Sequence, residues 1–520
     1  MRRLPVLTAT VVAALAVGTA VTSASSAAAV DDVSTTKLRR AVTVNGILGH
    51  ERALQRIANQ NGGTRASGTP GYAASVTYVK QTLKTAGYSV KEQKFTFPFF
   101  RELAPAELSQ VSPTATEYET HTLDYSGSGE VTGTLVPTKD IVVPPTPTPS
   151  STSGCEPEDF VPASATAPQI ALIQRGTCTF EIKAQNAVAA GYDAVVIFNE
   201  GQPGRDDLLT GTLGSPPGVP VVGVSFADGA ALYAAAQAGA VTLNVVTSTE
   251  NSPNAETYNV IAETKGGDKD KVLVVGAHLD SVATGPGIND NGSGSSTLLE
   301  VAEQISELKL TPRQKIRFIF FGAEEAGLLG SEHYVASLSD TTLSKIYANL
   351  NFDMLGSPNY VRFVYDGDGS DGEVAGPPGS GEIEKIFTDY FAGQGLASEP
   401  TDFNGRSDYG PFIAAGIPAG GLFSGAEGIK TPEQAAIYGG TAGEPYDSCY
   451  HEACDDITNL STKALGELGD GAAHAIWTLA KSRTGLYEDG SLRARSRASV
   501  SATGRAAAPA PVHQGHQAAR

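Results

Sequence analysis

Three hydrophobic segments of the chain each end in side chains that could bind a metal ion. The apolar run 272–277 leads into His278 and Asp280. Two later runs also end in carboxylates, with Glu324 and Glu325 after 316–321 and Asp353 after 347–352. Continuous apolar runs are typical of parallel strands covered on both faces, and ligands bind at the carboxyl edge of such sheets. A single His-x-Asp pair more often forms only a hydrogen-bonded loop, but three similar strand ends predict one shared crevice.

The chemistry of these side chains favours zinc. The candidate set contains two imidazoles and four carboxylates, namely His278, Asp290, Glu324, Glu325, Asp353 and His451. Zinc binds nitrogen and oxygen donors, whereas calcium prefers oxygen alone. Three carboxylate ligands would leave excess negative charge around a single zinc ion in a partly buried site, so two ions fit the charge better. Two such ions can activate one water and polarise a carbonyl together, which predicts hydrolysis of an acyl bond.

The neighbouring residues Glu324 and Glu325 are expected to have different roles. Successive side chains of an extended backbone diverge, so the two carboxylates cannot reach the same ion. One is expected to bind metal, and the other to take a proton from water and pass it to the leaving amine. The helical zinc-protease motif His-Glu-x-x-His is absent, because Asp455 stands where the segment 451–455 would need a second histidine.

The first 29 residues have the pattern of a secretory signal. Two arginines follow Met1, the segment 4–21 is apolar, and the small residues 23–29 end in an Ala-x-Ala cleavage pattern. A membrane anchor fits less well, because threonines and Gly18 interrupt the apolar segment. The mature protein is therefore expected to be secreted into the extracellular space without stable membrane association.

The composition limits the classes of partner. With 520 residues the chain is too long for one core, which predicts two domains. A formal net charge of −19 argues against nucleic-acid binding, since phosphate recognition needs a basic surface. The tail 486–520 combines arginines with Ala, Ser, Gly and Pro, which predicts a disordered segment that is open to trimming after export.

Four cysteines are expected to form two disulfides. An even number of cysteines suits an exported protein, and their spacing suggests the pairs Cys155–Cys178 and Cys449–Cys454. Zinc-finger ligation is the alternative, but the sequence contains no Cys-x-x-Cys motif.

The order of elements predicts an α/β domain with another domain inserted into it. A helix is expected over 33–62, a second helix over 72–86 and a strand over 89–97. The two parts of the α/β domain are expected at 33–124 and 255–483. The later helices of this domain are expected at 293–308, 328–338, 383–394 and 462–481.

The middle segment, 125–250, supplies none of the candidate ligands. Short strands are expected at 131–136, 141–143, 170–173 and 194–198, with a helix at 181–190. The Pro-rich stretch 144–154 is interpreted as a loop with no means of packing. The segment 169–199, which begins QIALIQRGTCTFEIK, resembles a protease-associated domain, a non-catalytic insert or lid in exopeptidases and other proteases. The resemblance implies a small β-rich α+β module.

The remaining parts of the chain resemble the zinc-dependent exopeptidases of the secreted bacterial leucyl aminopeptidase type. The resemblance covers about 33–124 and 259–481. Its motifs are HLDS at 278–281, GINDNGSG at 287–294, GAEEAGLLGS at 322–331, NFDM at 351–354 and YH at 450–451. The resemblance implies a mixed, largely parallel sheet with helices on both faces.

The same resemblance implies a set of metal ligands. The set is His278 and Asp353 for one zinc ion, Glu325 and His451 for the other, and Asp290 as the bridge. Family members can carry a cis peptide bond after the bridging aspartate, which here would be Asp290–Asn291.

Further residues acquire expected roles from this resemblance. Glu324 is the general base, and Asp280 orients His278 from behind, as metal-bound imidazoles usually require. Tyr450 is expected to lie near the oxyanion of the reaction intermediate. Arg406 belongs to a loop that resembles the substrate-side loop of the family, although its charge alone gives it no definite role.

These expectations predict a secreted dizinc aminopeptidase, a monomer that removes N-terminal, apolar residues from peptides. A related exopeptidase, such as a dipeptidase or a carboxypeptidase, is the alternative among enzymes. A non-catalytic binding protein on the same scaffold would be expected to have damaged ligand positions, and none of the five is damaged. Histidines outside the ligand pattern are assigned to structure or solvent, among them His50, His121, His333 and His474.

Overall fold

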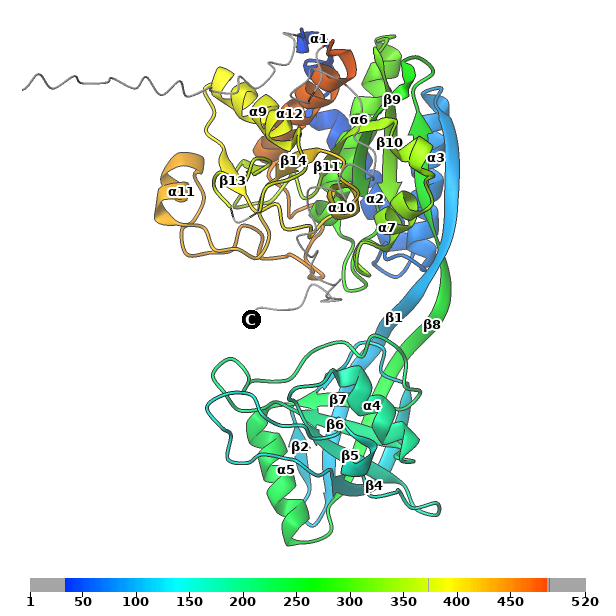
Figure 1. Cartoon of the computed structure of the whole chain (residues 1–520), viewed down its shortest axis with the longest axis vertical. Coiled ribbons are helices and arrows are strands. Elements are labelled where there is room, and N and C mark those ends of the chain that lie inside the picture. Colours follow the sequence, from blue (N-terminus) through cyan, green and yellow to red (C-terminus); the bar gives the residue numbers. More distant parts are fainter. Residues whose placement is uncertain (1–32, 373, 484–485, 487–520) are drawn as a thin grey trace, which may run out of the picture.

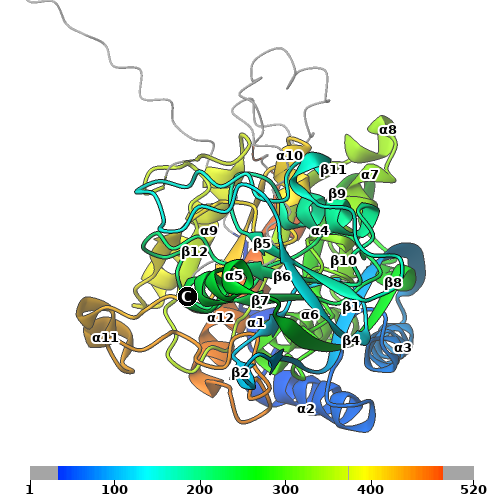
Figure 2. The same ribbon diagram turned by 90° about the horizontal axis from the view of Figure 1, so that it is seen from below.

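The chain folds into two bodies that are joined by a pair of long strands (Figure 1). The computed structural model describes residues 33–372, 374–483 and 486, so the expected signal segment 1–29 and all but the first residue of the tail 486–520 lie outside the described residues. Strands β1 (Ser89–Ser112) and β8 (Thr242–Glu263) pair antiparallel along their whole length and pass from the larger body into the smaller one. In the view from below, the smaller body lies in front of the larger one (Figure 2).

The larger body is built on a mixed, largely parallel sheet, as the sequence predicts. Its strand order is β13-β12-β14-β11-β9-β10-β8. The bounds are β9 (Asp268–His278), β10 (Gln314–Phe321), β11 (Ile346–Phe352), β12 (Phe363–Tyr365), β13 (Glu399–Thr401) and β14 (Ala419–Phe423). Strands β10, β9, β11 and β14 run parallel to one another, while β8 is antiparallel to β10. Because β8 enters from the smaller body, the carboxyl ends of β9, β10 and β11 point back towards that body.

Helices cover both faces of this sheet. In β9 the side chains of Leu273 and Val275 pack against one set of helices, whereas Val272 and Val274 pack against the other. The first set is α1 (Thr36–Arg39), α2 (Val44–Gln60), α3 (Pro70–Thr85), α6 (Gly294–Glu307), α9 (Ser380–Gly393) and α12 (Thr462–Lys481). The second set is α7 (Leu329–Ala336), α8 (Asp340–Leu343) and α10 (Gly410–Ala414). A short helix, α11 (Pro432–Tyr438), lies apart from both sets.

The prediction of a single helix over 33–62 is wrong. The segment forms α1 and α2, with a break at residues 40–43. The Thr43 side chain accepts a hydrogen bond from the backbone N–H of Gly46 at 3.0 Å, which caps the start of α2. The spacing of apolar residues does not reveal this break, because α1 and α2 both turn their apolar residues to the same face of the sheet.

The smaller body is the inserted module, and it also has two covered faces. Its parallel strands β4 (Gly129–Pro137), β5 (Gln169–Gln174), β6 (Ala194–Phe198) and β7 (Val221–Val224) are joined by the short strands β2 (Thr116–Tyr118) and β3 (His121–Thr122). Helix α4 (Phe180–Ala189) packs on one face and α5 (Phe226–Ala238) on the other, and a short 3₁₀ turn covers Pro157–Asp159. Leu108 of β1 lies in this core, so the expected first part of the α/β domain contributes to the module.

Two local expectations for the module are wrong. The segment 141–143 is not a strand, because the side chain of Gln174 takes the place of a neighbouring strand: it accepts from Val142 N at 2.7 Å and donates to Val142 O at 3.0 Å. The stretch 144–154 is packed at its end, where Ser151 and Ser153 are fully buried. The backbone N–H of Ser151 donates to the buried carboxylate of Glu200 at 3.1 Å.

Both expected disulfides are present. Cys155 is bonded to Cys178 within the module, and Cys449 is bonded to Cys454 in the larger body. No helix among the described residues combines the length and the apolar character needed to cross a bilayer.

Candidate metal centre

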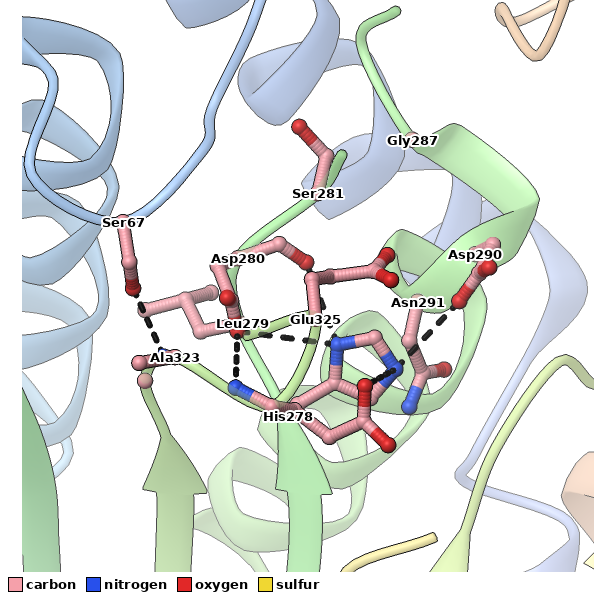
Figure 3. A network of polar contacts seen from close by, with 12 residues as sticks. Ser67, His278, Leu279, Asp280, Ser281, Gly287, Asp290, Asn291, Ala323 and Glu325 are labelled. Carbon is pink, nitrogen blue, oxygen red and sulfur yellow. Dashed lines mark hydrogen bonds and ion pairs between the residues drawn. The ribbon is translucent and has the colours of Figure 1, made fainter. Parts of the chain in front are cut away.

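Three neighbouring strands bring the expected ligands to one edge of the sheet. His278 is the last residue of β9, and Asp353 directly follows β11. Glu324 and Glu325 come three and four residues after Phe321, the last residue of β10. Figure 3 shows the tips of β9 and β10 side by side, with His278 and Ala323 at their ends. The crevice predicted from three apolar runs is therefore the place where these side chains meet.

Asp290 reaches this crevice from a tight turn before α6. The turn spans Ile288–Ser293, and the Asp290–Asn291 peptide bond is cis. Gly287 precedes the turn with a φ of 59°, and a Cβ on it would lie 2.3 Å from the carbonyl oxygen of Asp290. The carboxylate of Asp455 accepts hydrogen bonds from the backbone N–H groups of Asn289, at 2.8 Å, and Asp290, at 2.9 Å. The turn is thus held from outside as well as by its own glycine.

The carboxylate of Asp290 lies between the two imidazoles. One of its oxygens is 3.3 Å from His278 Nε2, and the other is 3.2 Å from His451 Nε2. His278 Nε2 is also 3.2 Å from Asp353 Oδ1, and His451 Nε2 is 3.2 Å from Glu325 Oε2. A neutral or charged imidazole nitrogen carries at most one proton, which cannot point well at two oxygens. Two nearly equidistant oxygens around each nitrogen are better explained by a shared cation.

The donor set fits zinc. Two ligands that are each about 2.0–2.1 Å from a tetrahedral zinc ion lie about 3.3 Å apart, which matches the separations between these nitrogen and oxygen atoms. Glu325 Oε1 is buried and has no hydrogen-bond partner among the described residues. Burial lowers the pKa of His451, but Glu325 and Asp290 outweigh it and raise that pKa to about 11. The carboxylates therefore attract positive charge to the place where the cations would lie.

Glu324 lies beside the ligands without joining their closest contacts. Its Oε2 is 4.0 Å from His278 Nε2, and the residue is only 3% exposed. Burial raises the pKa of Glu324 well above its ordinary value; His278 opposes the shift, and Glu325 adds to it. A desolvated carboxyl group with a raised pKa is suited to accepting and returning a proton.

Asp280 contacts His278 mainly through its backbone. The Nδ1 atom of His278 lies 3.2 Å from the Asp280 carbonyl oxygen and 3.7 Å from a carboxylate oxygen. That carboxylate oxygen accepts a hydrogen bond from the backbone N–H of Glu324 at 3.3 Å. Asp280 therefore links the ends of β9 and β10 instead of bonding only to the imidazole.

The short disulfide loop presents both Tyr450 and His451 to the centre. The bond between Cys449 and Cys454 encloses only four residues. His451 has a φ of 60°, a left-handed conformation that is uncommon for a non-glycine residue. The ring of Tyr450 stacks on the imidazole of His451 with a centroid distance of 3.9 Å. The loop thus fixes the backbone of one expected ligand.

Replacing Cys449 and Cys454 together by serine is expected to weaken zinc binding. Closing so short a loop is worth about 2 kcal/mol in chain entropy, so loss of that order would reduce affinity by up to about 30-fold. Zinc affinity can be measured by competition with a chromophoric chelator. The matched control is the double serine variant of Cys155 and Cys178, which lies in the module and should bind zinc like the wild type. Equal affinities in the two variants would show that the loop does not position His451.

Several supporting residues could not be identified from the sequence. Ser407 donates a hydrogen bond to Asp353 Oδ2 at 2.5 Å and accepts one from Asn351 Nδ2 at 2.8 Å. Asp455 holds the turn that carries Asp290, a role that its position in the segment 451–455 does not indicate. A serine or an aspartate in a loop has no spacing that marks it as such a partner, so only the three-dimensional arrangement identifies these roles.

Comparison with protein families gives two matches that together cover most of the described chain. Residues 259–476 match the peptidase family M28, and residues 131–232 match the PA domain. An aminopeptidase of Pseudomonas aeruginosa is 48% identical over 435 residues, which is 82% of this chain and 79% of that protein. The chain belongs to peptidase family M28. It is an enzyme of the zinc metallo-aminopeptidase class with an inserted protease-associated domain.

Other similar proteins agree with this assignment. A probable leucine aminopeptidase 2 of Aspergillus fumigatus is 41% identical over 80% of this chain and 79% of its own length. Among solved structures, an aminopeptidase from Aneurinibacillus sp. strain AM-1 has a TM-score of 0.62 at 26% identity, and the match covers 86% of this chain and 97% of that one. A zinc aminopeptidase from Bacillus subtilis has a TM-score of 0.58 at 26% identity, with 86% and 99% covered.

In this M28 peptidase a cavity of about 260 Å³ opens beside the five candidate ligands. Its walls include the aromatic side chains of Phe363, Tyr365, Tyr409, Phe423, Tyr446 and Tyr450. Arg406 also lines the cavity, where its exposed guanidinium pairs with Glu427 at 3.3 Å. Of the residues 420–425, only Phe423 lines the cavity.

The other four histidines among the described residues lie outside the centre of the enzyme. His50 contacts the Tyr78 phenol at 2.6 Å and Glu303 at 3.1 Å, and Glu300 lies nearby. His121 forms a hydrogen bond with Thr122, and His474 forms one with Thr35. The ring of His333 stacks on Phe95.

Proposed function

We propose that the chain is a secreted dizinc aminopeptidase that removes apolar N-terminal residues from peptides. The observation that carries the proposal is the position of Asp290, whose two carboxylate oxygens each face a different imidazole at 3.2–3.3 Å. One carboxylate placed in this way is suited to binding two cations at once. Export is supported by the signal-like segment 1–29 and by the two disulfides.

The proposed ligands divide between the two imidazoles. His278 and Asp353 would hold one zinc ion, His451 and Glu325 would hold the second, and Asp290 would contribute to both. When bound, the ions would supply Lewis-acid activation of water and of the scissile carbonyl. The five ligands contribute three negative charges, which largely neutralise the pair of ions in a buried place.

Glu324 is proposed as the general base. Its carboxylate accepts a proton from the attacking water and returns it to the leaving amine. The backbone hydrogen bond from Glu324 N to Asp280 keeps the start of this loop in register with the end of β9. The adjacent Glu325 is directed to His451, so the two glutamates act separately.

Replacing Tyr450 by phenylalanine is expected to lower kcat by about 10²–10³-fold, the usual cost of losing one oxyanion donor. The phenyl ring can still stack on His451, so zinc content should not change. Tyr88→Phe is the matched control, since its buried phenol donates to Ala302 O away from the centre. Steady-state kinetics on an aminoacyl anilide provides the measurement. A Tyr450→Phe enzyme with wild-type kcat would remove the phenol from the mechanism.

The aromatic walls of the cavity support a preference for apolar first residues. Phe363, Tyr365 and Phe423 can bury an aliphatic side chain, and each additional methylene that is buried is worth about 0.8 kcal/mol. Because the carboxyl ends of the strands point towards the module, a peptide has to reach the centre from that side of the larger body.

The proposal is tested with matched substrates on the purified, mature protein. Leucyl, alanyl and glutamyl anilides are compared with N-blocked peptides that have a free carboxyl end. An aminopeptidase hydrolyses the anilides, in the order set by the apolar pocket, and leaves the blocked peptides intact. Hydrolysis of blocked peptides alone would indicate a carboxypeptidase. We also propose that the enzyme acts as a monomer, which gel filtration of the active protein checks.

We propose that the chain divides into a first peptidase part at 33–124, the inserted module at 125–250 and a second peptidase part at 255–483. Limited proteolysis of the folded protein tests it, since cleavage between the bodies should leave a fragment that contains 131–232. Protein sequencing of the secreted enzyme tests cleavage near Ala29 and trimming within 486–520.

A further inference from the structure

A fully buried arginine lies directly behind the metal centre. Arg65 belongs to the segment between α2 and α3, and none of its surface is exposed. We propose that Arg65 is a positioning residue, which sets the backbone between His278 and Asp290 in its metal-binding shape before zinc arrives. This inference rests on the proposed dizinc function.

The guanidinium group of Arg65 contacts three carbonyl groups of one connecting segment. Its Nε donates to Pro286 O at 2.7 Å, Nη1 donates to Leu279 O, and Nη2 donates to Gly287 O. Leu279 directly follows His278, and Gly287 comes three residues before Asp290. The arginine therefore ties together both ends of the stretch that joins these two proposed ligands.

The backbone around Arg65 reinforces the same contact. Arg65 N donates to Ser281 Oγ at 3.0 Å, and Thr64 Oγ1 donates to Val282 O at 2.9 Å. Two residues later, Ser67 Oγ accepts from the backbone N–H of Ala323 at 2.7 Å, directly before Glu324 (Figure 3). One short segment, 64–67, thus contacts the loops after both β9 and β10.

The charge of Arg65 also suits this position. Burial lowers the pKa of the guanidinium, while the carboxylates of Glu51, Asp280, Asp455 and Asp290 oppose the shift. Arginine keeps its charge in proteins and presents its donors in a rigid planar fork. A lysine would keep the charge but supply only one compact donor group on a flexible stem, so it could not hold three separated carbonyls in the same way.

An ordinary structural role for Arg65 makes a different prediction from a positioning role. A side chain that only fills the core changes the stability of the zinc-free and zinc-loaded proteins equally when it is altered. A side chain that prepares the ligand geometry affects the loaded form more, because zinc binding must then also order the loop. The affinity for zinc is therefore the decisive quantity.

The test compares Arg65→Lys with the wild type and with Arg317→Lys. Arg317 of β10 is a matched control, because it is a partly buried arginine that pairs with Glu263 of β8 and Tyr334 of α7 instead of contacting the centre. Zinc affinity is measured by competition with a chelator. The unfolding temperature is measured with and without zinc, and kcat and KM are measured on leucyl anilide. We expect Arg65→Lys to bind zinc about 10–100-fold more weakly, and its kcat to fall by a larger factor than its KM changes. Arg317→Lys should match the wild type in these quantities.

A second measurement needs no variant. In the zinc-free wild type, the backbone amides of 279–291 are expected to stay protected from hydrogen exchange, as in the loaded enzyme. Free exchange of this stretch without zinc would overturn the proposal, even if Arg65→Lys fails to fold. Wild-type zinc affinity in Arg65→Lys would overturn it as well. A wild-type protein that binds no zinc or cleaves no N-terminal residue would instead contradict the proposed function.

Discussion

Replacing Glu324 by alanine is expected to lower kcat by about 10²–10⁴-fold while zinc content stays unchanged. The carboxylate of Glu324 is buried and lies 4.0 Å from His278 Nε2, farther than the carboxylates of Asp290 and Asp353. Its removal therefore takes away the proton carrier without taking away a ligand. Steady-state kinetics and metal analysis on the same preparation measure both effects.

The adjacent Glu325→Ala variant is the comparison that gives this result its meaning. Glu325 contacts His451 Nε2 at 3.2 Å, so its loss is expected to weaken zinc binding itself. Added zinc should then restore part of the activity of Glu325→Ala but none of the activity of Glu324→Ala. If both variants lose zinc to the same extent, Glu324 is a ligand and not the proton carrier.

Replacing Asp290 by alanine is expected to have the largest effect on zinc content. Without the shared carboxylate, the two ions lose a common ligand and the negative charge that lies between them. Zinc content should fall below two ions per chain. Loss of metal stabilisation worth several kcal/mol corresponds to a decrease in kcat/KM of at least about 10²–10³-fold.

A buried aspartate in the module is the control for this variant. Asp159 is 5% exposed and accepts a hydrogen bond from Glu156 N at 3.2 Å, outside the larger body. Asp159→Ala should keep both zinc ions and full activity. An Asp290→Ala enzyme that retains two zinc ions would be inconsistent with a bridging carboxylate.

The fold of the larger body follows from features that a sequence displays openly. The runs 272–277 and 316–321 are apolar without interruption, which indicates strands buried on both faces, and they became β9 and β10. The full lengths of β1 and β8 were not predictable. Beyond about 97, polar residues interrupt the alternation of β1, and the pairing with β8 depends on a partner 130 or more residues away.

The candidate site also contains residues that the sequence predicts and residues that it does not. Ligand types that stand at the ends of apolar runs, such as His278 and Asp353, can be recognised from their positions. The partners that hold them can not: Arg65 and Ser407 act through backbone carbonyls or through another side chain, and neither contact leaves a pattern in the sequence. The additional contact of Asp280 could not be predicted for the same reason, because its carboxylate accepts a hydrogen bond from the backbone N–H of Glu324.

We propose above all that one aspartate, Asp290, joins two zinc ions. The most direct measurement is a titration of the zinc-free mature enzyme with zinc, followed by metal analysis and by activity on leucyl anilide. We predict that binding ends at two ions per chain and that Asp290→Ala lowers this number. A wild-type enzyme that is fully active with a single zinc ion would contradict it.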